Sequence, residues 1–148
     1  MSKPAPATPA FWARRRRPAV RMLVGLAAVS LMFSLTSCEE AGRAYFYRHT
    51  GYNGGVASRG NDDSTFTNNT FSDGSPLNDN VSSVSNQDDQ WILVYNDSNY
   101  GGWRMCIGPR SRVFDMGHYG GANDDASAVD MNVPEAPPGC TWRIEGNG

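Results

Sequence analysis

The chain has 148 residues and a mass of 16.1 kDa, enough for one domain and too short for two of ordinary size. Charge is divided unevenly: residues 1–37 carry six basic side chains and no acid, whereas residues 38–148 carry seven arginines and all 15 acids, a net charge of −8. A surface with that charge argues against nucleic acid as a partner, because phosphates need a basic face.

Residues 1–37 have the organisation of an export signal. A basic region, Arg14–Arg21, precedes the apolar stretch Met22–Leu35, which ends at Leu35-Thr36-Ser37-Cys38. As a helix, Met22–Ser37 would span roughly 24 Å, which falls short of the ~30 Å hydrocarbon core and disfavours the alternative of a transmembrane anchor.

The sequence Leu-x-Ser-Cys at this place resembles the bacterial lipoprotein box. That resemblance implies that Cys38 is acylated and becomes the first residue of an exported, cell-surface lipoprotein that meets the membrane through its lipid only. The four consecutive arginines are similar to a twin-arginine signal, but Arg-Arg-Pro-Ala follows where such a signal has hydrophobic residues. The export route stays open.

The mature part, residues 38–148, favours β-structure. It contains no lysine, and 48 of its 111 residues are Asn, Asp, Ser or Gly. These residues weaken helices, because Gly is too free and the short polar side chains compete for backbone hydrogen bonds. We therefore expect a turn-rich all-β domain behind a short lipidated tether at residues 38–42.

Two aromatic hairpins recur at an offset of 48 residues. The pattern Tyr47-x4-Tyr52-x-Gly54 matches Tyr95-x4-Tyr100-x-Gly102. The first tyrosine of each copy lies in a segment predicted to be a strand, residues 43–49 and 91–95. Glycines at the bend supply a positive φ at little cost, and the second tyrosine of each pair can cover the bend.

A second element recurs behind each hairpin, at an offset of 45. Asn78-Asp79-Asn80-Val81-Ser82-Ser83-Val84 matches Asn123-Asp124-Asp125-Ala126-Ser127-Ala128-Val129. The loop of residues 60–76 absorbs the difference between the offsets. Two elements repeated in the same order indicate an internal duplication. Asn61-Asp62-x-x-Thr65 also fits part of the pattern, but it lacks the following Ser and the right distance from a hairpin, so we interpret it as a coincidence.

These motifs resemble the βγ-crystallin Greek-key family in its calcium-binding microbial form. The resemblance covers residues 43–132, with motif one at 43–87 and motif two at 90–132, and implies a sandwich of two Greek-key motifs. The sequence is also similar to bacterial metalloproteinase inhibitors built on that fold. The bias of 12 arginines against one lysine fits a high-GC bacterium.

The resemblance implies calcium sites shared between the two loop elements. The implied ligands are Asp79, Asn80, Ser82, Asp124, Asp125 and Ser127, with Asn78 and Asn123 shaping the loops. Carboxylates, amides, hydroxyls and turn carbonyls are the hard oxygen donors that Ca²⁺ takes. In the family the last hydroxyl ties its loop to the hairpin, which Ser83 can do and Ala128 cannot. The alternative is that these residues only form Asx and Ser turns.

The cysteine count predicts one disulfide. If Cys38 carries lipid, Cys106 and Cys140 remain, and outside the cytoplasm a disulfide is their default state. Two free buried thiols are the alternative. His49 and His118 stand alone in the sequence, which disfavours a zinc site. Residues 133–148 form a C-terminal extension in which the prolines of 134–138 interrupt any strand, and residues 141–144 are expected to add an edge strand.

Catalytic motifs for nucleophiles, phosphates or zinc are not found in the sequence, so we expect a non-enzymatic protein. Trp91, Tyr95, Trp103 and Trp142 are interpreted as core residues, with a sugar-stacking platform as the alternative. Three functions remain: a lipid-anchored domain that binds and is stabilised by calcium, an inhibitor of an extracellular protease, and a structural envelope module with eroded sites. The sequence does not specify calcium affinity, target protease or oligomeric state.

Overall fold

The computed structural model describes residues 39–146, which form eight strands and two short 3₁₀ helices. The predicted signal and Cys38 lie outside the described residues. The elements are β1 (Ala44–His49), β2 (Asn53–Arg59), η1 (Phe66–Asn68), β3 (Ser83–Asn86), β4 (Trp91–Asp97), β5 (Gly101–Ile107), β6 (Arg112–Val113), η2 (Met116–His118), β7 (Ala128–Val133) and β8 (Trp142–Ile144). None of the helices within this range is long and apolar enough to cross a membrane.

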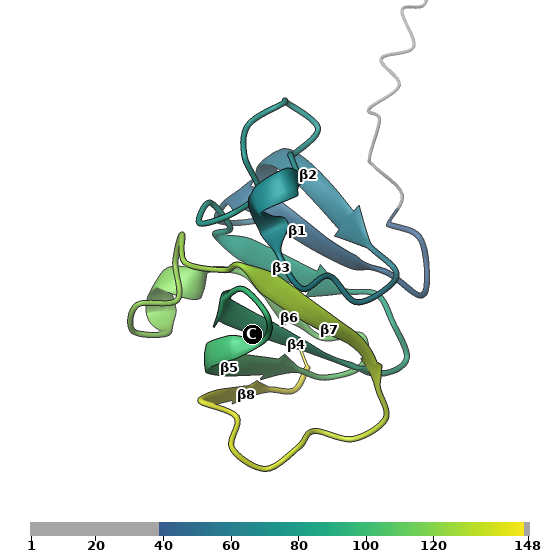
Figure 1. Ribbon diagram of the computed structural model, residues 1–148. Coiled ribbons are helices and arrows are strands. Elements are labelled where there is room, and N and C mark those ends of the chain that lie inside the picture. The colour runs from purple at the N-terminus through teal and green to yellow at the C-terminus, as the bar shows by residue number, and fades with distance from the viewer. Residues whose placement is uncertain (1–38, 147–148) are drawn as a thin grey trace, which may run out of the picture. The chain divides into compact units, whose positions relative to one another are not determined.

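The strands form two four-stranded sheets, and each motif lends a segment to the sheet of the other. Sheet A has the order β2-β1-β3-β6 and sheet B the order β7-β4-β5-β8, as Figure 1 shows. Strand β6 belongs to motif two but pairs with β3 of motif one. In return, Asp63 of motif one forms an antiparallel bridge with Val129 of β7. The predicted all-β sandwich of two Greek keys is confirmed.

The main core cluster takes alternate residues of the strands, and a second, smaller cluster consists of Trp91, Leu93, Tyr95, Cys106 and Ala128. In β1, Ala44 and Phe46 are fully buried in the main apolar cluster. The same cluster takes Val84 from β3 and Val129 from β7, the two strands that follow the repeated loop elements. Trp91 and Tyr95 are buried as expected, whereas Trp103 and Trp142 are half-buried and pack edge to face at the border of the core.

Both hairpins contain the same irregularity. The register shifts between Tyr47 and His49 against β2, and again between Tyr95 and Asp97 against β5. Gly54 and Gly102 have φ of 79° and 72°. A Cβ on Gly54 would lie 2.6 Å from the His49 ring, so the bend needs glycine for space as well as for conformation. The repeat at an offset of 48 thus corresponds to one backbone shape used twice.

The C-terminal extension completes sheet B. Strand β8 pairs in parallel with β5, in the segment for which the sequence predicted an edge strand. The Cys106–Cys140 disulfide is present, with a Cα–Cα distance of 5.8 Å. A hydrogen bond of 2.7 Å from the Thr141 amide to the Arg104 carbonyl continues the attachment.

Glu39 is held on the outer face of sheet A, although the sequence suggested a tether for residues 38–42. Its carboxylate accepts hydrogen bonds from the Tyr47 hydroxyl at 2.5 Å and the Ser85 hydroxyl at 2.9 Å. It also pairs with the Arg112 guanidinium at 2.8 Å. The described chain therefore begins with a fixed residue.

Candidate functional site

The two predicted loop elements lie against each other. The Asp79 amide donates to the Ala126 carbonyl and the Asp124 amide to the Val81 carbonyl, both at 3.1 Å. We call residues 78–83 and 123–128 the paired loops. Their backbone contacts are reciprocal, and they bring together the two loops between which the resemblance implied shared sites.

Side chains cross between the paired loops in the same reciprocal way. The Ser127 hydroxyl donates to Asp79 Oδ1 at 3.1 Å, and Ser82 Oγ lies 3.2 Å from Asp124 Oδ1. We call Asp79 with Ser127 site 1, and Asp124 with Ser82 site 2. Both serines are buried, whereas both carboxylates are exposed to solvent. Each site thus combines one fixed hydroxyl with one carboxylate that is open to an ion.

Site 2 brings together more oxygen atoms than one proton can satisfy. Ser82 Oγ lies 2.8 Å from the Arg48 carbonyl, the shorter of its two contacts. A hydroxyl has one proton, so when it donates to Arg48 it faces Asp124 Oδ1 with a lone pair. Two acceptor oxygens that converge at 3.2 Å are an arrangement that a cation relieves.

The backbone conformation of each aspartate and a hydrogen bond from the preceding asparagine set the direction of its carboxylate. Asp79 and Asp124 both have φ of 54°, in the left-handed region that a residue with a Cβ rarely adopts. The amide groups of Asn78 and Asn123 donate to the Oδ2 atoms of the following aspartates at 2.6 and 2.7 Å. These contacts leave each Oδ1 directed to the serine of the opposite loop.

One buried oxygen beside site 1 has no partner. Asn78 Oδ1 is inaccessible to solvent and accepts no hydrogen bond within residues 39–146. An unpaired buried acceptor costs about 1–3 kcal/mol, which a bound cation would offset.

The third loop positions differ between the copies. The Asn80 amide donates to the Asn78 carbonyl at 2.8 Å, a local turn contact. Asp125 Oδ2 accepts the Trp103 indole N–H at 3.0 Å. From the sequence, Trp103 is interpreted as a core residue, with sugar stacking as the alternative, and nothing in the spacing of residues 103 and 125 predicts this bond. Asp125 is therefore partly engaged by the protein itself.

The hairpins are clamped unequally. Ser83 Oγ accepts from the Tyr52 amide at 3.1 Å and donates to the His49 carbonyl at 2.7 Å. Ala128 has no hydroxyl for the same task. A different contact is common to both hairpins: the Gly51 amide donates to the Phe114 carbonyl at 2.9 Å, and the Asn99 amide donates to the Ser64 carbonyl at 2.7 Å.

The tyrosine pairs of the two hairpins have the same geometry. The ring centroids of Tyr47 and Tyr52 are 5.7 Å apart, and those of Tyr95 and Tyr100 are 5.6 Å apart, both pairs at an interplanar angle of 69°. Edge-to-face contacts of this kind contribute about 0.5–1.5 kcal/mol beyond burial. The predicted hairpin residues thus fix the ends of β1 and β4 against which the paired loops rest.

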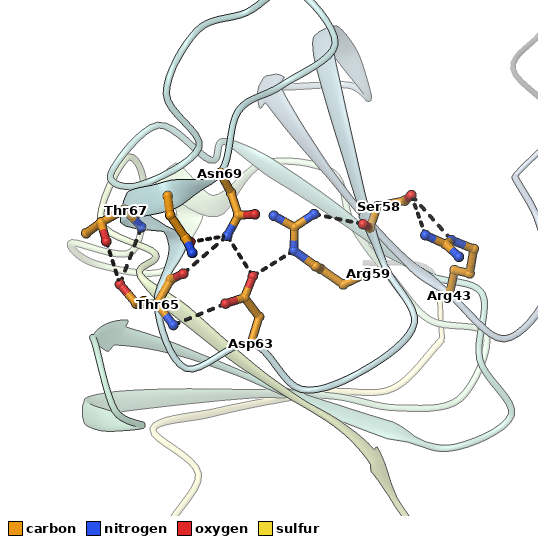
Figure 2. Close-up of polar contacts among 8 residues, drawn as sticks. Arg43, Ser58, Arg59, Asp63, Thr65, Thr67 and Asn69 are labelled. Carbon is orange, nitrogen blue, oxygen red and sulfur yellow. Dashed lines mark hydrogen bonds and ion pairs between the residues drawn. The ribbon is translucent and has the colours of Figure 1, made fainter.

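The acidic loop after β2 is occupied by structural contacts. Figure 2 shows Asp63 at the centre of a polar network, where its carboxylate accepts from Arg59 and Asn69 at 2.8 Å and from the Thr65 amide at 3.2 Å. Asp62 Oδ1 accepts from the Met131 amide at 2.8 Å. The side chains within residues 61–65, which fit part of the loop pattern, therefore hold this loop in shape. Thr65 is the N-cap of η1.

Charges elsewhere are tuned by local contacts. Burial, followed by the neighbouring Asp62, raises the pKa of Asp130. Hydrogen bonds from Ser75 lower the pKa of Asp73.

In the part of the chain that the structure describes, no three His, Cys, Asp or Glu side chains gather into a metal-binding group. A cation at the paired loops would therefore also need hydroxyl, amide or backbone oxygens.

Comparison with known proteins supports the resemblance drawn from the repeats. The model of peptidase inhibitor family I36 matches residues 36–107. A structure solved in a study of the evolution of the eye lens βγ-crystallin domain fold has a TM-score of 0.58 and 22% identity, covering 66% of this chain and 91% of that one. The chain has the βγ-crystallin fold.

Other βγ-crystallin domains agree. A βγ-crystallin from Ciona intestinalis has a TM-score of 0.53 and 20% identity, with 62% of this chain and 100% of that chain covered. Spherulin 3a from Physarum polycephalum has a TM-score of 0.53 and 24% identity, with 68% and 93% covered. No curated protein matches the sequence significantly. The likeness covers 91–100% of these three structures and 62–68% of this chain.

Proposed function

We propose that the protein is an exported, lipid-anchored and non-enzymatic βγ-crystallin domain that binds calcium at sites 1 and 2. The observation that carries this proposal is the reciprocal pairing of Asp79 with Ser127 and of Asp124 with Ser82. Each site takes oxygens from both motifs, so an ion at either one would tie the motifs together. The inhibitor family and the crystallin fold are both non-catalytic kinds of protein.

The donors at the two sites suit calcium. Site 2 offers Asp124 Oδ1, Ser82 Oγ and the Arg48 carbonyl. Site 1 offers Asp79 Oδ1 and Ser127 Oγ, beside the unpartnered Asn78 Oδ1. Calcium accepts such mixed carboxylate, hydroxyl and carbonyl sets and fills its remaining positions with water. The bound ion would supply charge neutralisation at the strained aspartates, and its effect would be stability rather than chemistry.

Calcium titration of residues 39–148 by calorimetry tests this proposal. We expect saturable heat with a stoichiometry of about two and dissociation constants between roughly micromolar and millimolar, as for extracellular calcium modules. Asp79→Asn and Asp124→Asn should each weaken one site, whereas Asp89→Asn, which removes an exposed charge outside the paired loops, should leave both unchanged. Absence of heat from calcium would leave the alternative of a structural module with eroded sites.

The lipid anchor is proposed from the sequence of the lipoprotein box at Cys38. The intact mass of the protein from the membrane fraction should correspond to residues 38–148 plus acyl groups. Stable anchoring requires two signals, for example two acyl chains or one chain with a basic patch, and the acidic residues 38–148 lead us to expect more than one acyl chain. A mass that includes residues 1–37, or cleavage elsewhere without lipid, would contradict the anchor.

A second candidate function is inhibition of an extracellular protease. The match to peptidase inhibitor family I36 favours it. The purified domain should then block a thermolysin-like metalloprotease stoichiometrically. Unchanged protease activity at excess domain, across several metalloproteases, would count against inhibition and leave the calcium proposal untouched.

A further inference from the structure

Phe114 is an exposed aromatic side chain on a rigid piece of backbone. It is 53% exposed, the largest value among the exposed large hydrophobic residues of the described chain. Val113 before it and Met116 after it are fully buried, and its carbonyl accepts the Gly51 amide at 2.9 Å. Its ring stands edge-on to Tyr52, with centroids 5.8 Å apart at 89°. The ring is thus presented to solvent in a fixed place.

The fold does not require an aromatic residue there. The duplicated position is Ser64, whose carbonyl accepts the Asn99 amide at 2.7 Å as the Phe114 carbonyl accepts that of Gly51. The same backbone contact is therefore made once with a small polar residue and once with an exposed Phe. Phe114 also lies beyond the segment that the inhibitor family model matches. The backbone contact therefore does not account for the aromatic side chain at position 114.

A chain of contacts connects Phe114 to the beginning of the described chain. The Arg112 guanidinium lies over the Tyr52 ring, 5.5 Å from its centroid, and pairs with the Glu39 carboxylate at 2.8 Å. Glu39 is 14% exposed and is bound on two further sides by Tyr47 and Ser85. Residue 38 is bonded to Glu39, and consecutive Cα atoms are about 3.8 Å apart. Any lipid on Cys38 would begin one residue from this fixed point.

We propose that the surface formed by Tyr52, Arg112 and Phe114 rests on the lipid bilayer and sets the orientation of the domain. The inference depends on the proposed acylation of Cys38. A lipid attached to a fixed residue brings the adjoining protein surface to the headgroups, where aromatic rings and arginine are favourable. The contact adds a second attachment to the acyl chains, and we expect it to involve the first hairpin and not the second hairpin around Tyr100.

Hydrogen exchange of the acylated protein tests this orientation. The full chain is expressed, the lipoprotein is purified from the membrane fraction, and its mass establishes the acyl groups. Amide exchange is then compared between phosphatidylcholine vesicles and detergent micelles. We expect residues 50–53 and 112–116 to exchange about threefold or more slowly on vesicles, and residues 98–101 to exchange equally in both.

Two exposed aromatic residues provide matched variants. Phe114→Ser, which places the residue type of the duplicated position there, should abolish the slowing at 112–116. Tyr100→Ser, at the 41% exposed ring of the second hairpin, should leave it unchanged. Equal exchange in both hairpins of the acylated parent overturns the inference while acylation stands, and a mass without acyl groups overturns both. If Phe114→Ser abolishes inhibition of a metalloprotease but not the slowing on vesicles, the surface belongs to a protease and the inference is wrong.

Discussion

The Ser127 hydroxyl donates a hydrogen bond of 3.1 Å to Asp79, across 48 residues and from one Greek-key motif to the other. Its counterpart joins Ser82 and Asp124 across 42 residues at 3.2 Å. Because each pair takes one residue from each motif, neither motif contains a complete site. An ion bound between the members of a pair would contact both motifs, so we expect calcium binding to stabilise their packing.

The hairpin clamp should be measurable with two opposite substitutions. Ser83→Ala removes the partner of the Tyr52 amide and of the His49 carbonyl, and we expect a loss of about 1–3 kcal/mol in unfolding free energy. Ala128→Ser supplies the missing hydroxyl to the second hairpin, and a gain of about 0.5–1.5 kcal/mol is expected. Urea unfolding of both variants gives these values. If Ala128→Ser instead lowers the free energy of unfolding by as much as Ser83→Ala does, a hydroxyl at position 128 does not clamp the second hairpin and the expectation is wrong.

The disulfide should stabilise the C-terminal strand. It joins positions 34 residues apart, for which the chain-entropy model gives on the order of 4 kcal/mol. Cys106→Ala with Cys140→Ala should lower the free energy of unfolding by a few kcal/mol and increase hydrogen exchange in residues 142–144. If denatured parent protein shows the same number of thiols before and after reduction, the bridge does not form.

The contact of Glu39 with Tyr47 predicts a dependence on alkaline pH. Burial, and next the hydrogen bond to Glu39, raise the pKa of Tyr47 well above its ordinary 10. A group with a raised folded pKa contributes stability that is complete below its unfolded pKa and is lost as the pH rises through the folded one. We therefore expect stability to fall above pH 10 as the phenol is forced to ionise. Absorbance at 295 nm should show one tyrosine that titrates last.

Glu39→Gln is the matched variant for this titration. It keeps a hydrogen-bond acceptor but removes the charge, so the last tyrosine should ionise at lower pH than in the parent. Tyr47→Phe identifies the signal, because the last step should disappear. An unchanged last step in Tyr47→Phe would assign it to another tyrosine and contradict the attachment of Glu39.

The sequence predicted the fold because the duplication contains its main constraints. The tyrosines and glycines of the two hairpins fix similar bends, and the serines and aspartates of the loops lie where the resemblance to βγ-crystallins implied shared sites. The docking of Glu39 could not be predicted, since it depends on Ser85 and Arg112, which are distant in sequence and have no special spacing. The bond between Asp125 and Trp103 escaped for the same reason. Local patterns predicted local backbone shapes, whereas single contacts between distant surface side chains became visible only in the structure.

The two calcium sites should differ in affinity. The loop of residues 78–83 is clamped by Ser83 and is already ordered, whereas the loop of residues 123–128 lacks that clamp and must be ordered on binding, which costs affinity. The charge of Asp125 opposes this difference, but its carboxylate is partly engaged by Trp103. We expect the site that depends most on the first loop to be tighter. Calorimetry should resolve two steps, both weaker at high salt because the net charge of −8 on residues 38–148 is screened. A single step of two equal sites would contradict this prediction.

Calcium binding across the paired loops can be tested by thermal unfolding of residues 39–148. The melting temperature is measured in EDTA, in millimolar calcium and, as a control for ionic strength, in millimolar magnesium. At calcium about 100 times the dissociation constant, each site adds ~2.7 kcal/mol to the free energy of unfolding. Each occupied site should then raise the melting temperature by on the order of 10 °C. Ser82→Ala combined with Ser127→Ala should remove most of that shift. A melting temperature of the parent protein that ignores calcium, or a shift that survives both substitutions, would contradict the account.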